Sequence, residues 1–174
     1  RVKNLFELKN AQRVLINGNI FENSWSNAQD GTAILIKVGA ASQNGTLATT
    51  QDVTISNNIV RNANTGIRFA PIDDGTVEQM QRVTVHNNLM YDINNRLFDL
   101  STSNRPLTGF TLTHNTALHT PGTGRNSINI DELLILHHFQ WLLMRVVIYV
   151  LQFDSINEQH HFSLLNVVIS ILTQ

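Results

Sequence analysis

The chain contains no cysteine, only 3 prolines in 174 residues, and few aromatic side chains (7%). Without cysteine it cannot form disulfides, cysteine–zinc sites or a cysteine nucleophile. Charged residues make up only 14%, which is too few for a long coiled coil. The formal net charge is −1, so the chain lacks the basic excess that is typical of nucleic-acid-binding proteins. We therefore expect no nucleic-acid partner.

Hydrophobic residues make up 42% of the chain, which is enough for a buried core. Residues 1–131 hold 19 Asn and all 9 Gly, whereas residues 132–174 hold 2 Asn and no Gly. This shift predicts a domain over residues 1–131 and an apolar C-terminal tail over residues 132–174. The tail is open to three interpretations: a cap on the domain, an oligomerisation element, or an end that is not native to the fold. Because the first repeat is already in progress at residue 5, we expect the chain to be an internal fragment.

The tail does not look like a membrane span. Residues 133–153 are strongly apolar, but His137, His138, Gln140 and Arg145 interrupt them. A span of about 20 residues tolerates few such groups. We therefore expect no membrane span.

Four segments of the first part share one pattern, in which apolar residues alternate before a bend that ends in Asn. They are residues 14–21 (VLINGNIF), 53–60 (VTISNNIV), 83–90 (VTVHNNLM) and 110–117 (FTLTHNTA). Alternation and β-branched residues indicate strands. The Asn-Asn or Gly-Asn step indicates a tight bend, since both residues tolerate left-handed backbone geometry.

A second pattern, apolar-variable-apolar, lies between these segments and begins at Phe6, Ile34, Ile67, Phe98 and Ile128. The period of both patterns is close to 30 residues, which indicates one stacked supersecondary unit. A two-residue alternation excludes helical repeats, and the period is too short for propeller blades. The sequence therefore predicts an all-β fold, a right-handed parallel β-helix of about four coils, with strands of successive coils about 4.8 Å apart.

The bend asparagines fall at equivalent positions on successive coils: Asn19, Asn58, Asn88 and Asn115. Side-chain amides stacked in line can hydrogen-bond along the coil axis and satisfy polar groups at the turn. We therefore predict a structural asparagine ladder rather than a ligand site.

These repeats resemble the right-handed parallel β-helix proteins of the pectate-lyase-like superfamily, and the resemblance covers residues 5–130. It implies a fold and leaves the activity open, since the superfamily includes polysaccharide lyases, glycoside hydrolases, epimerases, tailspikes and non-enzymatic surface proteins. It also implies export, so we expect an extracellular or periplasmic location. Exposed strand edges at the coil ends make self-association a further expectation.

The middle residues of the apolar-variable-apolar segments should point to solvent and stack in a column: Glu7, Leu35, Arg68, Asp99 and Asn129. Lys37 should face the same side. In superfamily lyases an Arg or Lys abstracts the proton next to a uronate carboxylate. The resemblance thus makes Arg68 and Lys37 catalytic candidates and Asp99 a substrate-binding candidate. The simpler alternative is a surface ion pair between Arg68 and Asp99.

The loops supply further candidates. Trp25 is a candidate sugar-stacking platform, with coverage of the coil edge as its alternative. Asp73, Asp74 and Asp99 are a weak candidate Ca²⁺ site, although Asp73 and Asp74 also suit an ordinary turn. His86 and His114 precede the Asn bends of neighbouring coils, and we interpret them as solvent-side turn residues.

Two functions remain open at this point. The first is binding or lyase-like cleavage of an acidic polysaccharide on the outer face of the β-helix, with Ca²⁺ as a possible cofactor. The alternative is a non-catalytic surface or adhesion scaffold. An enzyme groove should gather Lys37, Arg68, Asp73, Asp74 and Asp99 in one concave patch, whereas a scaffold should leave that face flat.

Overall fold

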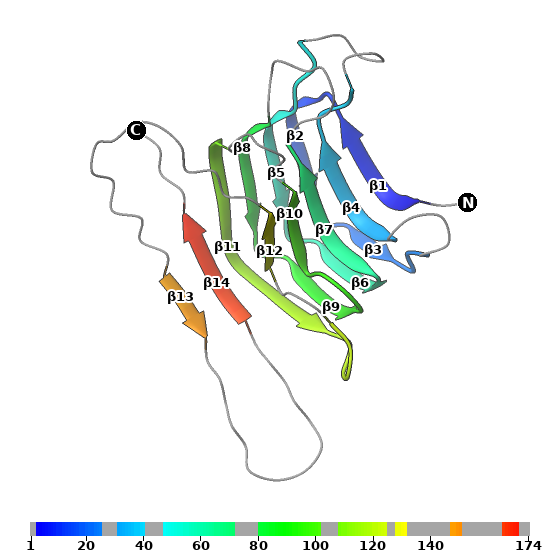
Figure 1. Cartoon of the computed structure of the whole chain (residues 1–174). Coiled ribbons are helices and arrows are strands. Elements are labelled where there is room, and N and C mark those ends of the chain that lie inside the picture. Colours follow the sequence, from blue (N-terminus) through cyan, green and yellow to red (C-terminus); the bar gives the residue numbers. More distant parts are fainter. Residues whose placement is uncertain are drawn as a thin grey trace.

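The computed structural model describes residues 3–25, 31–40, 47–71, 80–101, 108–124, 128–131, 147–150 and 165–170. All regular elements in these ranges are β-strands, so the all-β prediction is confirmed (Figure 1). One sheet, here called the front sheet, contains five strands that all pair in parallel. Its order is β1 (Asn4–Lys9), β4 (Thr32–Lys37), β7 (Thr65–Ala70), β10 (Phe98–Ser101) and β12 (Ile128–Asp131).

The other strands of the solenoid form two parallel stacks that meet at one long strand, β11 (Thr108–His119). The first stack contains β2 (Gln12–Asn17), β5 (Gln51–Ser56) and β8 (Gln81–His86). The second contains β3 (Ile20–Glu22), β6 (Ile59–Ala63) and β9 (Leu89–Ile93). Each coil therefore contributes one strand to each of three faces, which is the architecture of a parallel β-helix.

The solenoid has about three turns rather than the four coils predicted. The prediction of four coils equates each of the four repeated strand segments with one complete coil. A stack of four strands, such as β2, β5, β8 and β11, is joined by only three turns of the chain.

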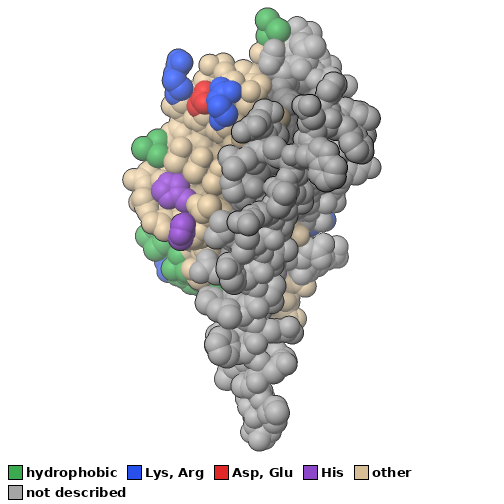
Figure 2. All heavy atoms as spheres, turned by 90° about the vertical axis from the view of Figure 1, so that its left-hand side faces the viewer, with side chains coloured by type: hydrophobic (Ala, Val, Ile, Leu, Met, Phe, Trp, Pro, Cys, Tyr) green, Lys and Arg blue, Asp and Glu red, His purple; other side chains and the backbone are tan. Residues whose placement is uncertain are grey.

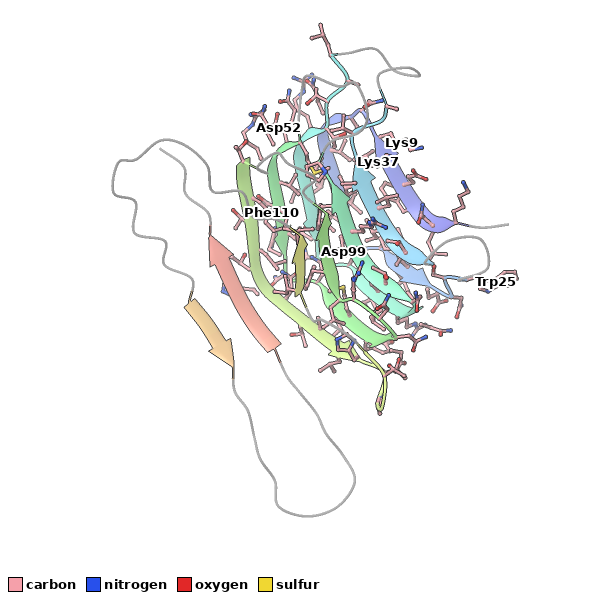
Figure 3. All side chains as sticks on the ribbon, viewed as in Figure 1. Lys9, Trp25, Lys37, Asp52, Asp99 and Phe110 are labelled. Atoms are coloured by element: carbon pink, nitrogen blue, oxygen red, sulfur yellow. The ribbon has the colours of Figure 1, made fainter. Side chains whose placement is uncertain are left out.

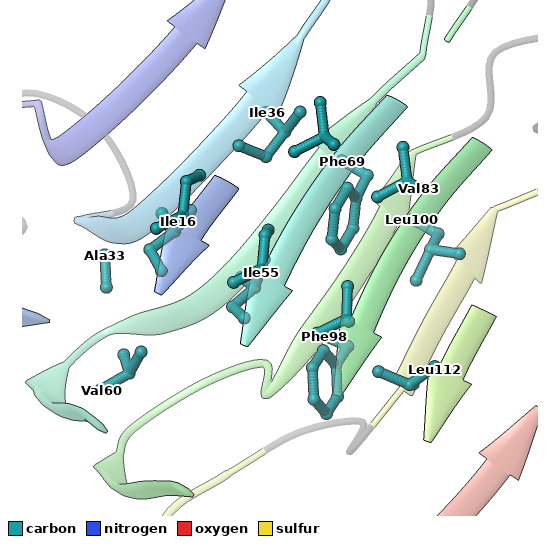
Figure 4. Close-up of a cluster of buried hydrophobic side chains, with 14 of the residues drawn as sticks. Ile16, Ala33, Ile36, Ile55, Val60, Phe69, Val83, Phe98, Leu100 and Leu112 are labelled. Atoms are coloured by element: carbon teal, nitrogen blue, oxygen red, sulfur yellow. The ribbon is translucent and has the colours of Figure 1, made fainter. Parts of the chain in front are cut away.

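The core consists of columns of inward side chains, one from each coil (Figure 4). In the front sheet Ile36 pairs with Phe69 and Phe69 with Leu100, and all three are buried. Phe69 also packs edge-on against Phe110 from the opposite face, with ring centroids 5.1 Å apart. Burial of such a side chain contributes about 1.5–3 kcal/mol, and all three faces supply such buried side chains to the core.

Left-handed backbone residues stack at the corners between the faces. At the corner after β2, β5 and β8, Gly18, Asn57, Asn87 and His114 occupy one column, with φ of 71°, 56°, 58° and 54°. Glycine and asparagine enter this region at low cost, whereas other residues meet a clash between Cβ and the carbonyl oxygen. The Gly-Asn and Asn-Asn steps of the sequence thus mark this corner.

The predicted asparagine ladder is confirmed. The Oδ1 atom of each inner Asn accepts hydrogen bonds from both the backbone N–H and the Nδ2 of the Asn on the preceding coil, at 2.9–3.1 Å. The Nδ2 atoms of Asn58, Asn88 and Asn115 also donate to carbonyl oxygens of Ile16, Ile55 and Val85. These asparagines are nearly fully buried apart from Asn19, which is exposed.

Two strands of the tail lie within the described residues. β14 (Leu165–Ser170) pairs antiparallel with β11, and β13 (Val147–Val150) pairs antiparallel with β14. The backbone of β14 thus extends the sheet beyond β11 (Figure 1). The part of the chain that the structure describes includes no helix with the length and hydropathy needed to cross a membrane.

Candidate functional site

The outward residues of the front sheet lie in the register that the repeat spacing predicts. Glu7 pairs with Leu35, Leu35 with Arg68, and Arg68 with Asp99. Asn129 pairs with Asp99 at the end of this column. Since inward and outward side chains alternate along a strand, the buried neighbours Ile67 and Phe69 place Arg68 on the outer face.

A second outward column lies two residues further along each strand. Lys9 pairs with Lys37 and Lys37 with Ala70, so the two lysines stand on adjacent strands (Figure 3). Sequence analysis named Lys37 but missed Lys9. The sequence spacing could have identified Lys9. Lys9 lies two residues after Glu7, just as Lys37 lies two residues after Leu35.

The two columns border an open groove of about 510 Å³ over β1, β4 and β7. Its lining is Lys3, Asn4, Glu7, Lys9, Thr32, Leu35, Lys37, Arg68 and Ala70. Four of these side chains are cationic and one is acidic, a formal excess of three positive charges. The whole chain has a net charge of −1, so positive charge is concentrated in this groove. A concave, cationic surface attracts anionic ligands.

Glu7 is the one carboxylate that lines the groove within the part of the chain that the structure describes. Its Oε1 lies 3.0 Å from Lys9 Nζ, and its Oε2 accepts a hydrogen bond of 3.2 Å from Asn4 Nδ2. Burial alone raises the pKa of Glu7, but these hydrogen bonds and the charges of Lys9 and Lys37 outweigh burial and bring the pKa below its ordinary value. Glu7 therefore stays ionised at neutral pH and acts as an internal counter-ion for Lys9.

Arg68 and Asp99 form an ion pair, as the simpler interpretation of the sequence proposes. Asp99 Oδ2 lies 3.4 Å from Arg68 Nε and 3.0 Å from Arg96 Nη1. The side chain of Asp99 is only 1% exposed, whereas that of Arg68 is 34% exposed. Asp99 was expected to face solvent, but two guanidinium groups lie against its carboxylate. Arg96 was missed because it lies in the turn before β10, outside the repeat pattern.

These contacts favour ion pairing by Asp99 over coordination of Ca²⁺. Calcium takes six to eight oxygen ligands, and Oδ2 of Asp99 already holds two arginines. Asp73 and Asp74 lie outside the described residues. Within the described residues, no group of three or more His, Cys, Asp or Glu side chains is placed to hold a metal ion.

Trp25 does not line the groove. It follows β3, is 66% exposed, and lies beyond the end of the sheet, well away from Lys9 and Lys37 (Figure 3). The structure thus brings Lys37 and Arg68 together in one concavity, joins Asp99 to it through Arg68, and leaves Trp25 apart.

The face seen in Figure 2 differs from the groove in the side chains that it carries. Figure 2 shows charged side chains gathered near one end of that face and histidines among mostly uncharged groups. Arg82 of β8 is paired with Asp52 of β5, with Nε and Nη2 donating to the two carboxylate oxygens, and this bidentate contact lowers the pKa of Asp52. His114 is exposed and His86 half-buried, so both lie on the solvent side as expected, but each belongs to a strand, β11 and β8, rather than to a turn.

Comparison with protein-family models, curated proteins and solved structures finds no match to this chain. Its function is therefore argued from the geometry and charge of the groove.

Proposed function

We propose that this protein binds an acidic polysaccharide, a chain of uronate sugars, in the groove over β1, β4 and β7. One observation carries the proposal: among the described residues, four cations and a single acid line this concavity, on a chain whose net charge is negative. Lys9 and Lys37 stand about 4.8 Å apart along the solenoid axis, with Arg68 on the next strand. Such a row suits repeated carboxylates rather than one isolated anion.

The uncharged lining supports a sugar over other polyanions. Leu35 and Ala70 offer apolar surface for the C–H groups of a pyranose ring, and Asn4 offers hydrogen bonds to hydroxyl groups. None of the described residues that line the groove is aromatic, whereas base stacking on aromatic residues is the usual mode of single-stranded nucleic-acid binding. The resemblance to pectate-lyase-like proteins adds support for a carbohydrate, and with it for an extracytoplasmic location.

Binding without cleavage is the form of the proposal that the chemistry favours. A general base must release its own proton before it can accept one from the substrate. Arg68 is instead engaged in an ion pair, with its Nε 3.4 Å from Oδ2 of Asp99. The groove thus suits an adhesion or recognition module better than a lyase with Arg68 as base.

The experiment is calorimetric titration with polygalacturonate and alginate, with neutral dextran as the control polymer. We expect the two polyuronates to bind and dextran not to bind. Lys37→Ala should weaken polyuronate binding about three- to fivefold, which is the order expected for one exposed ion pair. Arg82→Ala is the matched control, because Arg82 is a basic residue on another face, and it should leave the affinity unchanged.

Two results would overturn the proposal. Equal binding of dextran and polygalacturonate would remove the role of charge, and equal loss in Lys37→Ala and Arg82→Ala would remove the role of the groove. Ultraviolet detection of unsaturated products in the same mixtures would instead establish a lyase.

A further inference from the structure

We propose that Asp99 is a positioning residue that holds the guanidinium of Arg68 at the wall of the groove and does not itself touch the ligand. The inference rests on the proposed function, because it concerns how the same groove binds a polyuronate. Asp99 was first interpreted as a substrate-binding residue on the outer face. Its burial and its partners give it a different role.

The accessibility of the two side chains separates their roles. Arg68 lines the groove and is 34% exposed, so a ligand can reach it. Asp99 is 1% exposed and does not line the groove. Asp99, which pairs with Arg68 on the next strand, thus lies against Nε of Arg68 and below the surface that a ligand can reach.

The shape of a guanidinium turns this contact into a directional one. Its five N–H donors lie in one rigid plane, so an anion beside one edge favours one orientation of the whole group, here through an ion pair at 3.4 Å and not through a hydrogen bond from Nε. A lysine in place of Arg68 would keep the charge but lose this directionality. A preorganised cation also loses less conformational entropy when a ligand binds than one that moves freely.

Arg96 is a second cationic partner of the buried Asp99 side chain. An unpaired buried carboxylate is costly, and a second cation offsets that cost. Arg96 Nη1 lies 3.0 Å from the same Oδ2 atom, from a turn three residues before Asp99 on the chain. Arg96 does not line the groove, so it supports Asp99 rather than the ligand.

The test uses two acids whose neutralisation should have opposite effects on polygalacturonate binding. If only net charge mattered, both Asp99→Asn and Glu7→Gln would tighten binding by removing a negative charge near the groove. We expect Glu7→Gln to tighten binding severalfold, because it releases Lys9. We expect Asp99→Asn to weaken binding about tenfold, because it releases Arg68 from its fixed orientation.

Two further variants separate positioning from a general loss of structure. Asp99→Asn should have no additional effect on affinity in the Arg68→Ala background, since coupled residues are not additive. Arg68→Lys should behave like Asp99→Asn although it keeps the charge. Thermal melts of each variant identify any that fails to fold, and in that case Arg68→Lys, which keeps both charges of the pair, carries the test.

The outcomes distinguish the inference from the function on which it rests. Failure of the native chain to bind polygalacturonate overturns both. Binding by the native chain with unchanged or tighter binding by Asp99→Asn overturns the positioning role alone. Additive losses in the Arg68→Ala background have the same meaning, because the two residues would then act independently.

Discussion

Asn88 Oδ1 accepts two hydrogen bonds from Asn58, one from the backbone N–H at 3.0 Å and one from Nδ2 at 2.9 Å. The same two bonds join Asn88 to Asn115. Each inner rung thus satisfies polar groups on both neighbouring coils, and the coils cannot shift against each other without breaking several bonds. The ladder fixes the register on which the groove columns depend.

The first prediction concerns this ladder. Asn88→Ala leaves the buried N–H of Asn58 without its acceptor and removes the Nδ2 bonds to Oδ1 of Asn115 and to the carbonyl of Ile55, while the backbone N–H of residue 88 still bonds to Asn115. An unsatisfied buried group costs about 1–3 kcal/mol, so we expect a loss of about 3 kcal/mol or more in the free energy of unfolding. Urea denaturation followed by circular dichroism measures it.

Asn19→Ala is the matched control at the exposed end of the ladder. Water can replace its side-chain bonds, so it should cost about 1 kcal/mol. Equal losses at Asn19 and Asn88 would contradict a cooperative buried ladder.

The sequence predicted the repeat, the ladder and the outward column because all three follow from local patterns. Two-residue alternation fixes which side chains face inward, and a period near 30 fixes which residues stack. It did not predict that Asp99 is buried. One of the partners of Asp99 is Arg96, which lies in a turn where the sequence shows no repeat. The sequence also left open whether the outer face of the front sheet is concave or flat, since the depth of a surface depends on the length and direction of the side chains that border it.

His114 gives a prediction with a gain in stability. It occupies a left-handed corner position (φ 54°) where the other coils have Gly18, Asn57 and Asn87. A left-handed conformation costs a residue with a Cβ about 1–2 kcal/mol, and asparagine tolerates it better than most residues. We expect His114→Asn to raise the free energy of unfolding by about 0.5–1 kcal/mol.

The control for this prediction is His86→Asn on the adjacent coil. His86 ends a strand and is not in the left-handed region, so asparagine should bring no gain there. A similar gain from both variants would show that the effect comes from the loss of histidine and not from backbone strain.

Gly66 gives a prediction about packing between coils. A Cβ at this position would lie 2.5 Å from the carbonyl oxygen of Leu97 and 2.9 Å from Sδ of Met90. The backbone of Leu97 cannot move far, because its carbonyl accepts the N–H of Ile67 at 3.0 Å. Gly66→Ala should therefore destabilise the protein by about 2–3 kcal/mol through overpacking.

Gly18→Ala is the comparison for Gly66→Ala in the same urea experiment. Gly18 has open space around it but a positive φ of 71°, so its substitution meets only the backbone cost of about 1–2 kcal/mol. Gly18→Asn should cost less still, since Asn57 and Asn87 occupy the same column. A larger loss at Gly18 than at Gly66 would contradict the close approach of the coils at Leu97.

Glu7 gives a prediction about pH. Its pKa in the folded protein is lowered from 4.5, despite the opposing effect of burial, by hydrogen bonds from Lys9 and Asn4 and by the charges of Lys9 and Lys37. A group with a lowered folded pKa stabilises the protein above its unfolded pKa, and this contribution is lost as the pH falls through the folded value. The native chain should therefore be more stable than Glu7→Gln at pH 7, and the difference should shrink below pH 4.5.

Urea midpoints at a series of acidic pH values measure this difference in stability. Lys9→Ala removes the main partner of Glu7, so in that background the difference should depend less on pH. A difference that stays constant from neutral to strongly acidic pH would show that Glu7 stabilises the groove by packing rather than by charge.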